Sequence, residues 1–167
     1  MATPAESTTE QIAAAIESRL AGIEAGSTYW YTPEKVARCA YFDESWLSGL
    51  EGPVYLVRPG EEQIAEGTTA QMRTDTEFFI LVAIQDENET DNPFALQEVD
   101  AVSQVTLVNR AVRDVIVALV SDPTMGNLAV NVLENGADVT RNFFITGRWL
   151  CAEIRLTVSA LPLKATL

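Results

Sequence analysis

The sequence predicts an α+β domain in which a mostly antiparallel sheet carries two main helices on one side. Two segments, at about residues 9–25 and 97–121, place apolar residues at helical spacing, and the segments between and after them show strand patterns. The predicted order is therefore helix, strand, strand, helix, strand, strand. A length of 167 residues fits one domain over 1–167, with a flexible arm at 1–7 and a tail at 159–167.

The first helix is predicted from a start signal and an apolar stripe. Ser7 with Glu10, or Thr8 with Gln11, fits the capping box that satisfies the first free N–H groups of a helix. Gly26 is expected to end the helix. The stripe consists of Ile12, Ile16, Leu20 and Ile23.

The segment that follows, residues 27–53, is irregular and rich in aromatic side chains. A proline at a helix-start position predicts one helical turn over Pro33–Cys39. A short strand is expected at Val54–Val57, ended by Pro59-Gly60. The long strand at Thr69–Gln85 is apolar on both faces in its second half, so we expect that half to be covered on both sides.

The second helix is predicted from helical spacing over a long segment. β-Branching weakens its intrinsic helix preference, but the length and the stop signal at Asp122-Pro123 favour helix over strand. The expected stripe is Val102, Val105, Val108, Val112, Val115 (or Ile116) and Leu119.

The last third of the chain is predicted to be β. Strands are expected at Leu128–Leu133 and Val139–Ile145, with a hairpin-type turn at Asn135-Gly136. After a turn at Gly147, the segment Trp149–Val158 alternates between apolar and mostly polar positions. One face of this strand should therefore pack on the core.

Composition excludes several functions. Eleven Lys and Arg against 24 Asp and Glu give a net charge of −13, which argues against surfaces for nucleic acid or anionic lipid. The absence of histidine excludes histidine-based catalysis and histidine metal sites. Cys39 and Cys151 are expected to be reduced and to pack in the interior. With no signal peptide or membrane span expected, the sequence predicts a soluble cytoplasmic product.

Two local features are candidates for function. The acidic loop with Asp86, Glu87, Glu89 and Asp91 fits a solvated loop better than a calcium site, since its spacing is not that of an EF-hand. The stretch Tyr29-Trp30-Tyr31 fits either a core cluster packed on the first helix or an interface anchor. Lys35 and Arg38 lie near this stretch in the sequence and could pair with acidic groups of a second subunit.

The order of elements resembles the tail terminator (tail completion) proteins of long-tailed bacteriophages over about residues 10–160. The Tyr-Trp-Tyr-Thr-Pro stretch is the most distinctive part of the resemblance. The segments that carry it are Gln11–Leu20, Ala25–Val36, Pro53–Glu61, the long strand to Gln85, Arg110–Val115, Gly126–Val130 and the closing β ribbon.

The resemblance implies a non-enzymatic, cofactor-free virion protein assembled in the host cytoplasm. It implies a hexameric ring that caps the head-proximal end of the tail tube, stops tube growth and presents a surface to the head–tail connector. Tail tube protein and connector are then its partners, and DNA only passes through. Residues expected at the subunit or tube interface are Tyr29, Trp30, Tyr31, Lys35, Arg38 and Trp46. The acidic loop is expected to be mobile or to face the lumen.

Alternative functions stay open at this point. A head–tail connector or neck protein has the same general character and differs in the partner that it binds. A carboxylate-based hydrolase belongs to another class, and it requires a pair of carboxylates with raised pKa values in a pocket.

Overall fold

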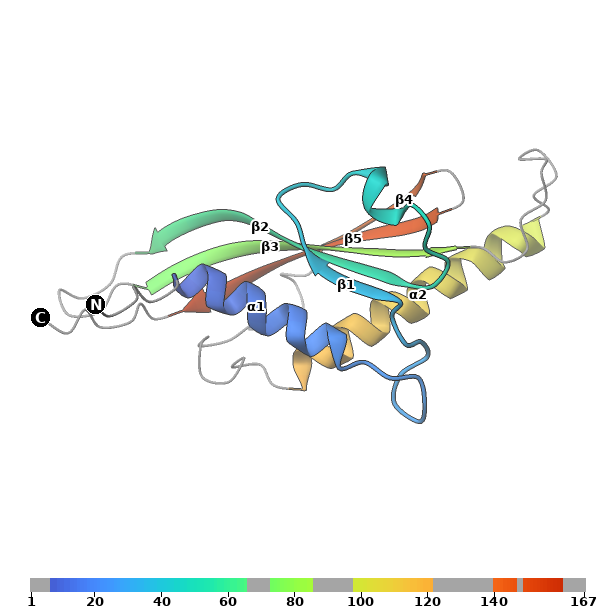
Figure 1. Ribbon diagram of the computed structural model, residues 1–167, viewed down its shortest axis with the longest axis horizontal. Coiled ribbons are helices and arrows are strands. Elements are labelled where there is room, and N and C mark those ends of the chain that lie inside the picture. The colour runs from blue at the N-terminus through green and yellow to red at the C-terminus, as the bar shows by residue number, and fades with distance from the viewer. Residues whose placement is uncertain (1–6, 66–72, 86–97, 122–139, 147–148, 161–167) are drawn as a thin grey trace, which may run out of the picture.

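A five-stranded sheet of order β1-β2-β3-β5-β4 forms the centre of the fold. The structure is a computed structural model, and it describes residues 7–65, 73–85, 98–121, 140–146 and 149–160. The elements are α1 (Thr8–Ala21), β1 (Lys35–Arg38), the 3₁₀ helix η1 (Glu44–Leu47), β2 (Val54–Ala65), β3 (Arg73–Gln85), α2 (Glu98–Val120), β4 (Thr140–Thr146) and β5 (Trp149–Ala160). Figure 1 shows α1 and α2 together on one side of the sheet, while η1 lies on the other.

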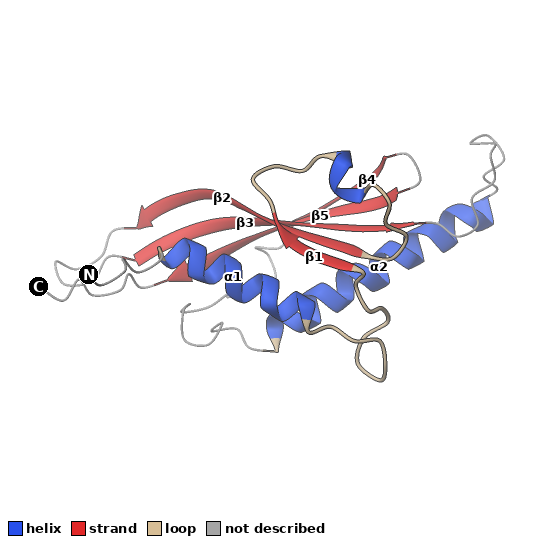
Figure 2. Ribbon diagram, in the orientation of Figure 1, coloured by secondary structure: helices blue, strands red, loops and turns tan. Residues whose placement is uncertain are grey.

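The pairing of the strands confirms the predicted α+β class. β2 with β3, β3 with β5 and β4 with β5 are antiparallel, and only the short edge strand β1 is parallel to its neighbour, β2. Figure 2 shows the two helices along one face of this sheet, as predicted. The sequence of elements differs from the predicted order because β1 precedes the two strands that were expected after α1.

The helical turn predicted over Pro33–Cys39 is wrong, because this segment contains β1. The Glu34 N–H donates to the Pro53 carbonyl at 2.8 Å, and the Cys39 N–H donates to the Val57 carbonyl at 2.9 Å. These bonds hold the segment extended along β2. The fixed φ of proline suits extended backbone as well as a helix start, so the pairing with a distant segment decides the conformation.

Helix α1 begins as predicted and ends earlier. Ser7 is the N-cap, and its hydroxyl accepts the Glu10 N–H at 3.2 Å. The helix ends at Ala21, and Gly22 rather than Gly26 is the C-cap. Gly26 instead donates its N–H to the Tyr29 carbonyl in the following turn. The predicted stripe is confirmed on the helix for Ile12, Ile16 and Leu20, which are buried. Ile23 is buried too, but it lies after the helix end.

The predicted stripe of α2 is confirmed in the second half of the helix, whereas the side chain of Val102 is not among those that the structure describes. Val108, Val112, Val115 and Leu119 are buried, together with Ala111 and Ala118. Val105 is 54% exposed, so its predicted place in the core is wrong. Figure 1 shows the first turns of α2 extending past the ends of the strands, where the sheet no longer covers the helix.

Each face of the sheet carries its own core. Between the sheet and the helices, the strands contribute Tyr55, Val57, Phe78, Ile80, Val82, Ile84, Leu150, Ala152, Ile154, Leu156 and Val158. On the other face, the segment around η1 covers Leu81, Ala83 and Trp149. The second half of β3 is therefore covered on both sides, as predicted. The alternation predicted for β5 is confirmed too, and this strand runs on to Ala160, into the predicted tail.

Both cysteines lie in the second core as free, buried thiols, as predicted. β2 and β3 separate β1, after which Cys39 follows, from β5, which holds Cys151. Burial raises the pKa of Cys39, and it raises the pKa of Cys151 to about 12. Neither thiol is therefore ionised near neutral pH, which makes both poor nucleophiles.

Strand β2 does not stop at Pro59-Gly60 but continues to Ala65 through a bulge. The pairing moves from Pro59 opposite Phe78 to Glu62 opposite Thr76, so Gly60 and Glu61 both face Glu77. Proline lacks a backbone N–H but is tolerated beside a bulge, where the regular ladder is interrupted. The strand therefore continues past Pro59, and the predicted strand end is wrong. The predicted strand Leu128–Leu133 and the turn at Asn135-Gly136 lie outside the described residues.

A side chain at position 60 should weaken this bulge. A Cβ added there would lie 2.7 Å from Phe79 Cε2 and 3.0 Å from Glu77 Cβ. We expect Gly60→Ala to lower the free energy of unfolding by about 1–3 kcal/mol, because overpacking forces neighbouring atoms to shift. Urea denaturation measures the change. Gly26→Ala, where an added Cβ meets nothing within 4 Å, is the matched control. Equal stability of the two variants would contradict this explanation.

Candidate interaction surface

A buried carboxylate fixes the loop between α1 and β1 on the surface of α2. Asp114 is 0% exposed, although it is an acidic residue within a helix. Its Oδ2 accepts the N–H of Trp30 at 2.8 Å and the N–H of Tyr31 at 2.9 Å. A charge buried in this way is tolerated only with such partners, so the loop and the helix stabilise each other.

Only one of the two carboxylate oxygens of Asp114 accepts hydrogen bonds from the described residues. Its Oδ1 has no hydrogen-bond partner, and the nearest cation of the described residues is Arg113, with Nη1 at 3.8 Å. The hydroxyl of Tyr55, fully buried in the core on β2, also has no hydrogen-bond partner within the part of the chain that the structure describes. Burial raises the pKa of Tyr55, and the negative charge of Asp114 raises it further. The charge of Asp114 thus acts on the core as well as on the loop.

The docked loop presents one aromatic side chain to solvent. Tyr29 and Tyr31 pack against the core, whereas Trp30 between them is 52% exposed. The guanidinium of Arg110 lies 4.1 Å from the centroid of the Trp30 ring, and Arg113 donates to the Thr28 carbonyl at 3.1 Å. We call Trp30, Arg110 and Arg113 the Trp30 surface. The two interpretations of the Tyr29-Trp30-Tyr31 stretch therefore apply to different residues. The two tyrosines pack on the core, whereas Trp30 faces outward and is available as an interface anchor.

Lys35 and Trp46 lie together on the other face of the sheet. The Lys35 Nζ is 5.0 Å from the centroid of the Trp46 ring, and Trp46 packs against the core that η1 covers. The six predicted interface residues therefore do not form one surface. Their contact with another subunit or with a tube stays a prediction.

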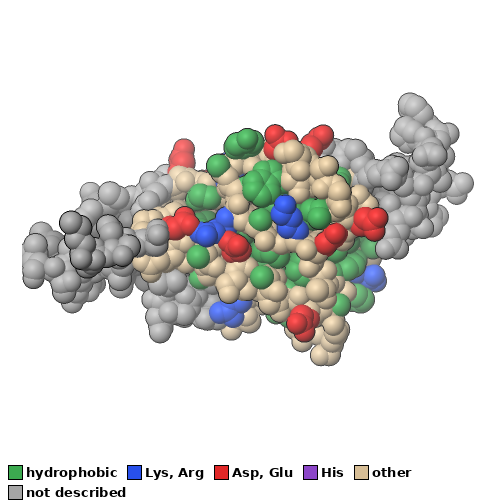
Figure 3. Space-filling view, viewed as in Figure 1, with side chains coloured by type: hydrophobic (Ala, Val, Ile, Leu, Met, Phe, Trp, Pro, Cys, Tyr) green, Lys and Arg blue, Asp and Glu red, His purple; other side chains and the backbone are tan. Residues whose placement is uncertain are grey.

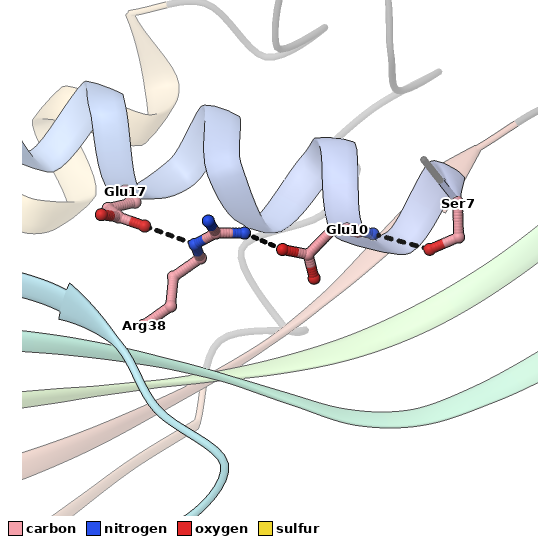
Figure 4. Close-up of polar contacts among 4 residues, drawn as sticks. All are labelled: Ser7, Glu10, Glu17 and Arg38. Carbon is pink, nitrogen blue, oxygen red and sulfur yellow. Dashed lines mark hydrogen bonds and ion pairs between the residues drawn. The ribbon is translucent and has the colours of Figure 1, made fainter. Parts of the chain in front are cut away.

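Arg38 acts within the chain. Its guanidinium forms ion pairs with Glu10 and Glu17, which follow each other on one side of α1 (Figure 4). The three side chains clamp α1 to β1 beside an open groove of about 520 Å³. The groove is lined by Glu10, Ala13, Glu17, Ala37, Arg38, Cys39, Ala40, Trp46 and Pro59.

A concentration of acidic side chains surrounds η1. Glu34 Oε2 accepts the N–H groups of Glu51 and Gly52, and these two bonds hold the pKa of Glu34 below its usual value. Asp43 caps η1 by accepting the Ser45 N–H at 2.9 Å. We call Glu34, Asp43, Glu44 and Glu51 the acidic connection. Figure 3 shows Asp and Glu side chains spread over the visible surface, with hydrophobic side chains and a few Lys and Arg side chains among them.

The predicted acidic loop is not part of the structure described, and the described residues show no metal-binding group and no membrane-spanning helix. Asp86, Glu87, Glu89 and Asp91 are outside the described residues, so their mobile or lumen-facing position stays a prediction. Among the described residues, no group of three or more Cys, Asp or Glu side chains is arranged to hold a metal ion. Within the same residues, no helix is long and apolar enough to cross a membrane.

Sequence analysis did not single out Asp114 or Arg110. One signal was available, because Asp114 lies among the apolar residues Ala111, Val115 and Ala118 on the same side of the predicted helix. A charged residue there indicates a buried partner, although the sequence alone does not say which one. The partner is a backbone segment 84 residues earlier in the chain.

Comparison with known proteins assigns no family to the chain. No family model matches it, and no curated protein matches it. The function must therefore be argued from the surfaces described above.

Removing the Asp114 carboxylate should release the loop. We expect Asp114→Ala to lower the free energy of unfolding by about 1–3 kcal/mol, because two N–H groups lose their acceptor. Hydrogen exchange at the Trp30 and Tyr31 amides should accelerate in parallel. Asp114→Asn, which keeps an acceptor oxygen, is the control and should lose less. Unchanged exchange at both amides in Asp114→Ala would refute this assignment.

Tyr55 should make the protein sensitive to alkali. Its pKa is raised above 10.0 in the folded chain, so the unfolded chain releases the proton first. This contribution to stability is complete below pH 10 and is lost as the pH rises above it.

The comparison of wild type with Tyr55→Phe tests this. Below pH 10 the variant should be at least as stable, because the hydroxyl that it removes has no partner. Above pH 10 the wild type should lose stability more steeply, as measured by thermal unfolding. Parallel pH profiles would show that the Tyr55 phenol does not titrate differently in the two states.

Proposed function

We propose that the protein is a structural virion component, the tail terminator of a long-tailed phage. In this function it forms a ring on the head-proximal end of the tail tube, stops tube growth and joins the tail to the head connector. The resemblance in the order of elements and in the Tyr-Trp-Tyr-Thr-Pro stretch suggests this function. The observation that carries it is the Trp30 surface.

The Trp30 surface has the properties of a protein-contact anchor. Trp and Arg are the residue types that most often dominate binding energy at protein interfaces. Trp30 is half exposed, yet its backbone is fixed by Asp114 and its ring is stacked on Arg110. An anchor ordered in advance loses little conformational entropy on binding, so more of its contact energy contributes to affinity.

The charge of the chain is compatible with a passage for DNA. A net charge of −13 on each copy gives a ring a strongly negative field. DNA phosphates are repelled by such a wall, so DNA would slide through without binding.

The carboxylates and the thiol described above do not favour the hydrolase alternative. Glu34 has a lowered pKa, whereas a carboxylic acid catalyst needs a raised one. Glu10 and Glu17 are both paired with Arg38 beside the open groove. The thiol of Cys151 is buried, and its pKa is raised to about 12.

Electron microscopy of lysates tests the proposed function. A nonsense codon in this gene, in the genome that encodes it, should give overlong tubes separate from DNA-filled heads, because nothing else stops tube growth. Tails of normal length beside unattached heads would instead assign a connector. Intact virions would contradict a structural function.

A point variant links this phenotype to the Trp30 surface. Trp30→Ala should reproduce the defect and reduce infectious particles at least tenfold, since it removes the anchor. Val120→Ala, another truncation of an exposed hydrophobic side chain, is the matched control and should leave the yield unchanged. Normal yield from Trp30→Ala would remove this surface from the proposal.

A further inference from the structure

We propose that the Trp30 surface of one copy binds the acidic connection of a second copy. The inference rests on the proposed function in that it names the surfaces through which neighbouring subunits of the ring meet. Its evidence lies in the charges, exposure and placement of the two surfaces.

The Trp30 surface is an unusual cationic site on an acidic chain. The chain has only 11 basic residues against 24 acidic ones. Several basic side chains are engaged within the chain: Arg38 pairs with Glu10 and Glu17, and Arg155 pairs with Glu77. Arg113 contacts Asp114 and the Thr28 carbonyl yet keeps 55% of its side chain exposed, and the Arg110 guanidinium lies over the exposed indole ring of Trp30. These groups fit a carboxylate-rich surface that also offers apolar contact.

The acidic connection offers the complementary chemistry. It carries four carboxylates, and the basic residues around it are engaged within the chain. Lys35 lies over Trp46, Arg38 is held by α1, and Arg58 lies over the rings of Phe42 and Phe79. Tyr41, next to it in the chain, is 65% exposed, the largest exposed fraction among the large hydrophobic side chains described. The segment therefore combines negative charge with an exposed aromatic ring, as the Trp30 surface combines positive charge with an exposed indole ring.

The two surfaces lie on opposite sides of the sheet. The loop that carries Trp30 packs on the core beneath the helices, whereas η1 covers the core of the other face. Glu34 follows Trp30 by only four residues, but η1, with Asp43 and Glu44, lies on the other face of the sheet, so a two-fold dimer cannot join all of both surfaces in one interface. Their contact must instead run head to tail, and repetition of such a contact closes a ring or extends a filament.

Two copies of net charge −13 repel each other at long range. Contact is therefore favoured where opposite charges meet locally, within about a Debye length of 8–10 Å. The Trp30 surface and the acidic connection provide such a meeting. Like charges in the same places would oppose assembly, which makes charge reversal a sensitive test.

Charge exchange between the two surfaces tests the proposal with the full chain. Arg110→Glu and Glu51→Arg should each weaken self-association at least tenfold, because each places like charges across the contact. An equimolar mixture of the two variants should assemble again. When the two variants alternate, Glu at position 110 of one copy meets Arg at position 51 of the next. The following contact then joins an unchanged Trp30 surface to an unchanged acidic connection. Sedimentation velocity measures the assembly state, and Glu61→Arg, a charge reversal on exposed β2, is the control.

The outcomes are distinct. Loss of assembly in each variant and recovery in the mixture support the proposal, provided that thermal unfolding shows both variants folded. Unchanged assembly in either folded variant, or no recovery in the mixture, overturns it. A wild-type chain that stays monomeric at the highest soluble concentration also overturns it, since a second copy is then not the partner. That result leaves the lysate phenotype untouched, so failure here is separable from failure of the proposed function.

Discussion

The buried carboxylate of Asp114 is the interaction on which the rest of the surface depends. It joins α2 to the loop between α1 and β1 through two backbone N–H groups, and it keeps Tyr29 and Tyr31 against the core. Burying a charge is costly, and the cost is offset only while the loop stays docked. The same loop places Trp30 over Arg110. A packing constraint inside the chain therefore determines which aromatic side chain the protein presents outside.

Local periodicity in the sequence predicted the helices and strands that bury one face against the core. The stripe of α1 and the alternation of β5 are visible in the sequence because burial repeats every three to four residues in a helix and every two in a strand. β1 was missed because its extended shape depends on pairing with Val54–Val57, far along the chain. Val105 was misplaced because the sequence does not show where α2 passes beyond the sheet.

The candidate site was predictable only in part, for a related reason. The Tyr-Trp-Tyr stretch was recognised by composition, but its division into two packed tyrosines and one exposed tryptophan depends on an acceptor 84 residues away. Arg38 looked available for a partner because its neighbours in the chain are uncharged, yet Glu10 and Glu17 on α1 engage it. The acidic connection is spread from residue 34 to 51, and β1 and η1 gather it on one face. Surfaces of this kind are made by tertiary contacts, whereas composition shows only that their members exist.

The central claim is that Trp30 contacts another protein subunit in the assembled state. A photo-reactive aromatic amino acid incorporated at position 30 tests it most directly, in particles assembled with the full-length chain. The account predicts adducts between position 30 and residues 34–51 of a second copy, or with the tail tube protein, identified by mass spectrometry. Efficient photolysis without any adduct between chains would contradict the claim, because a side chain buried in a contact has a partner within bonding distance.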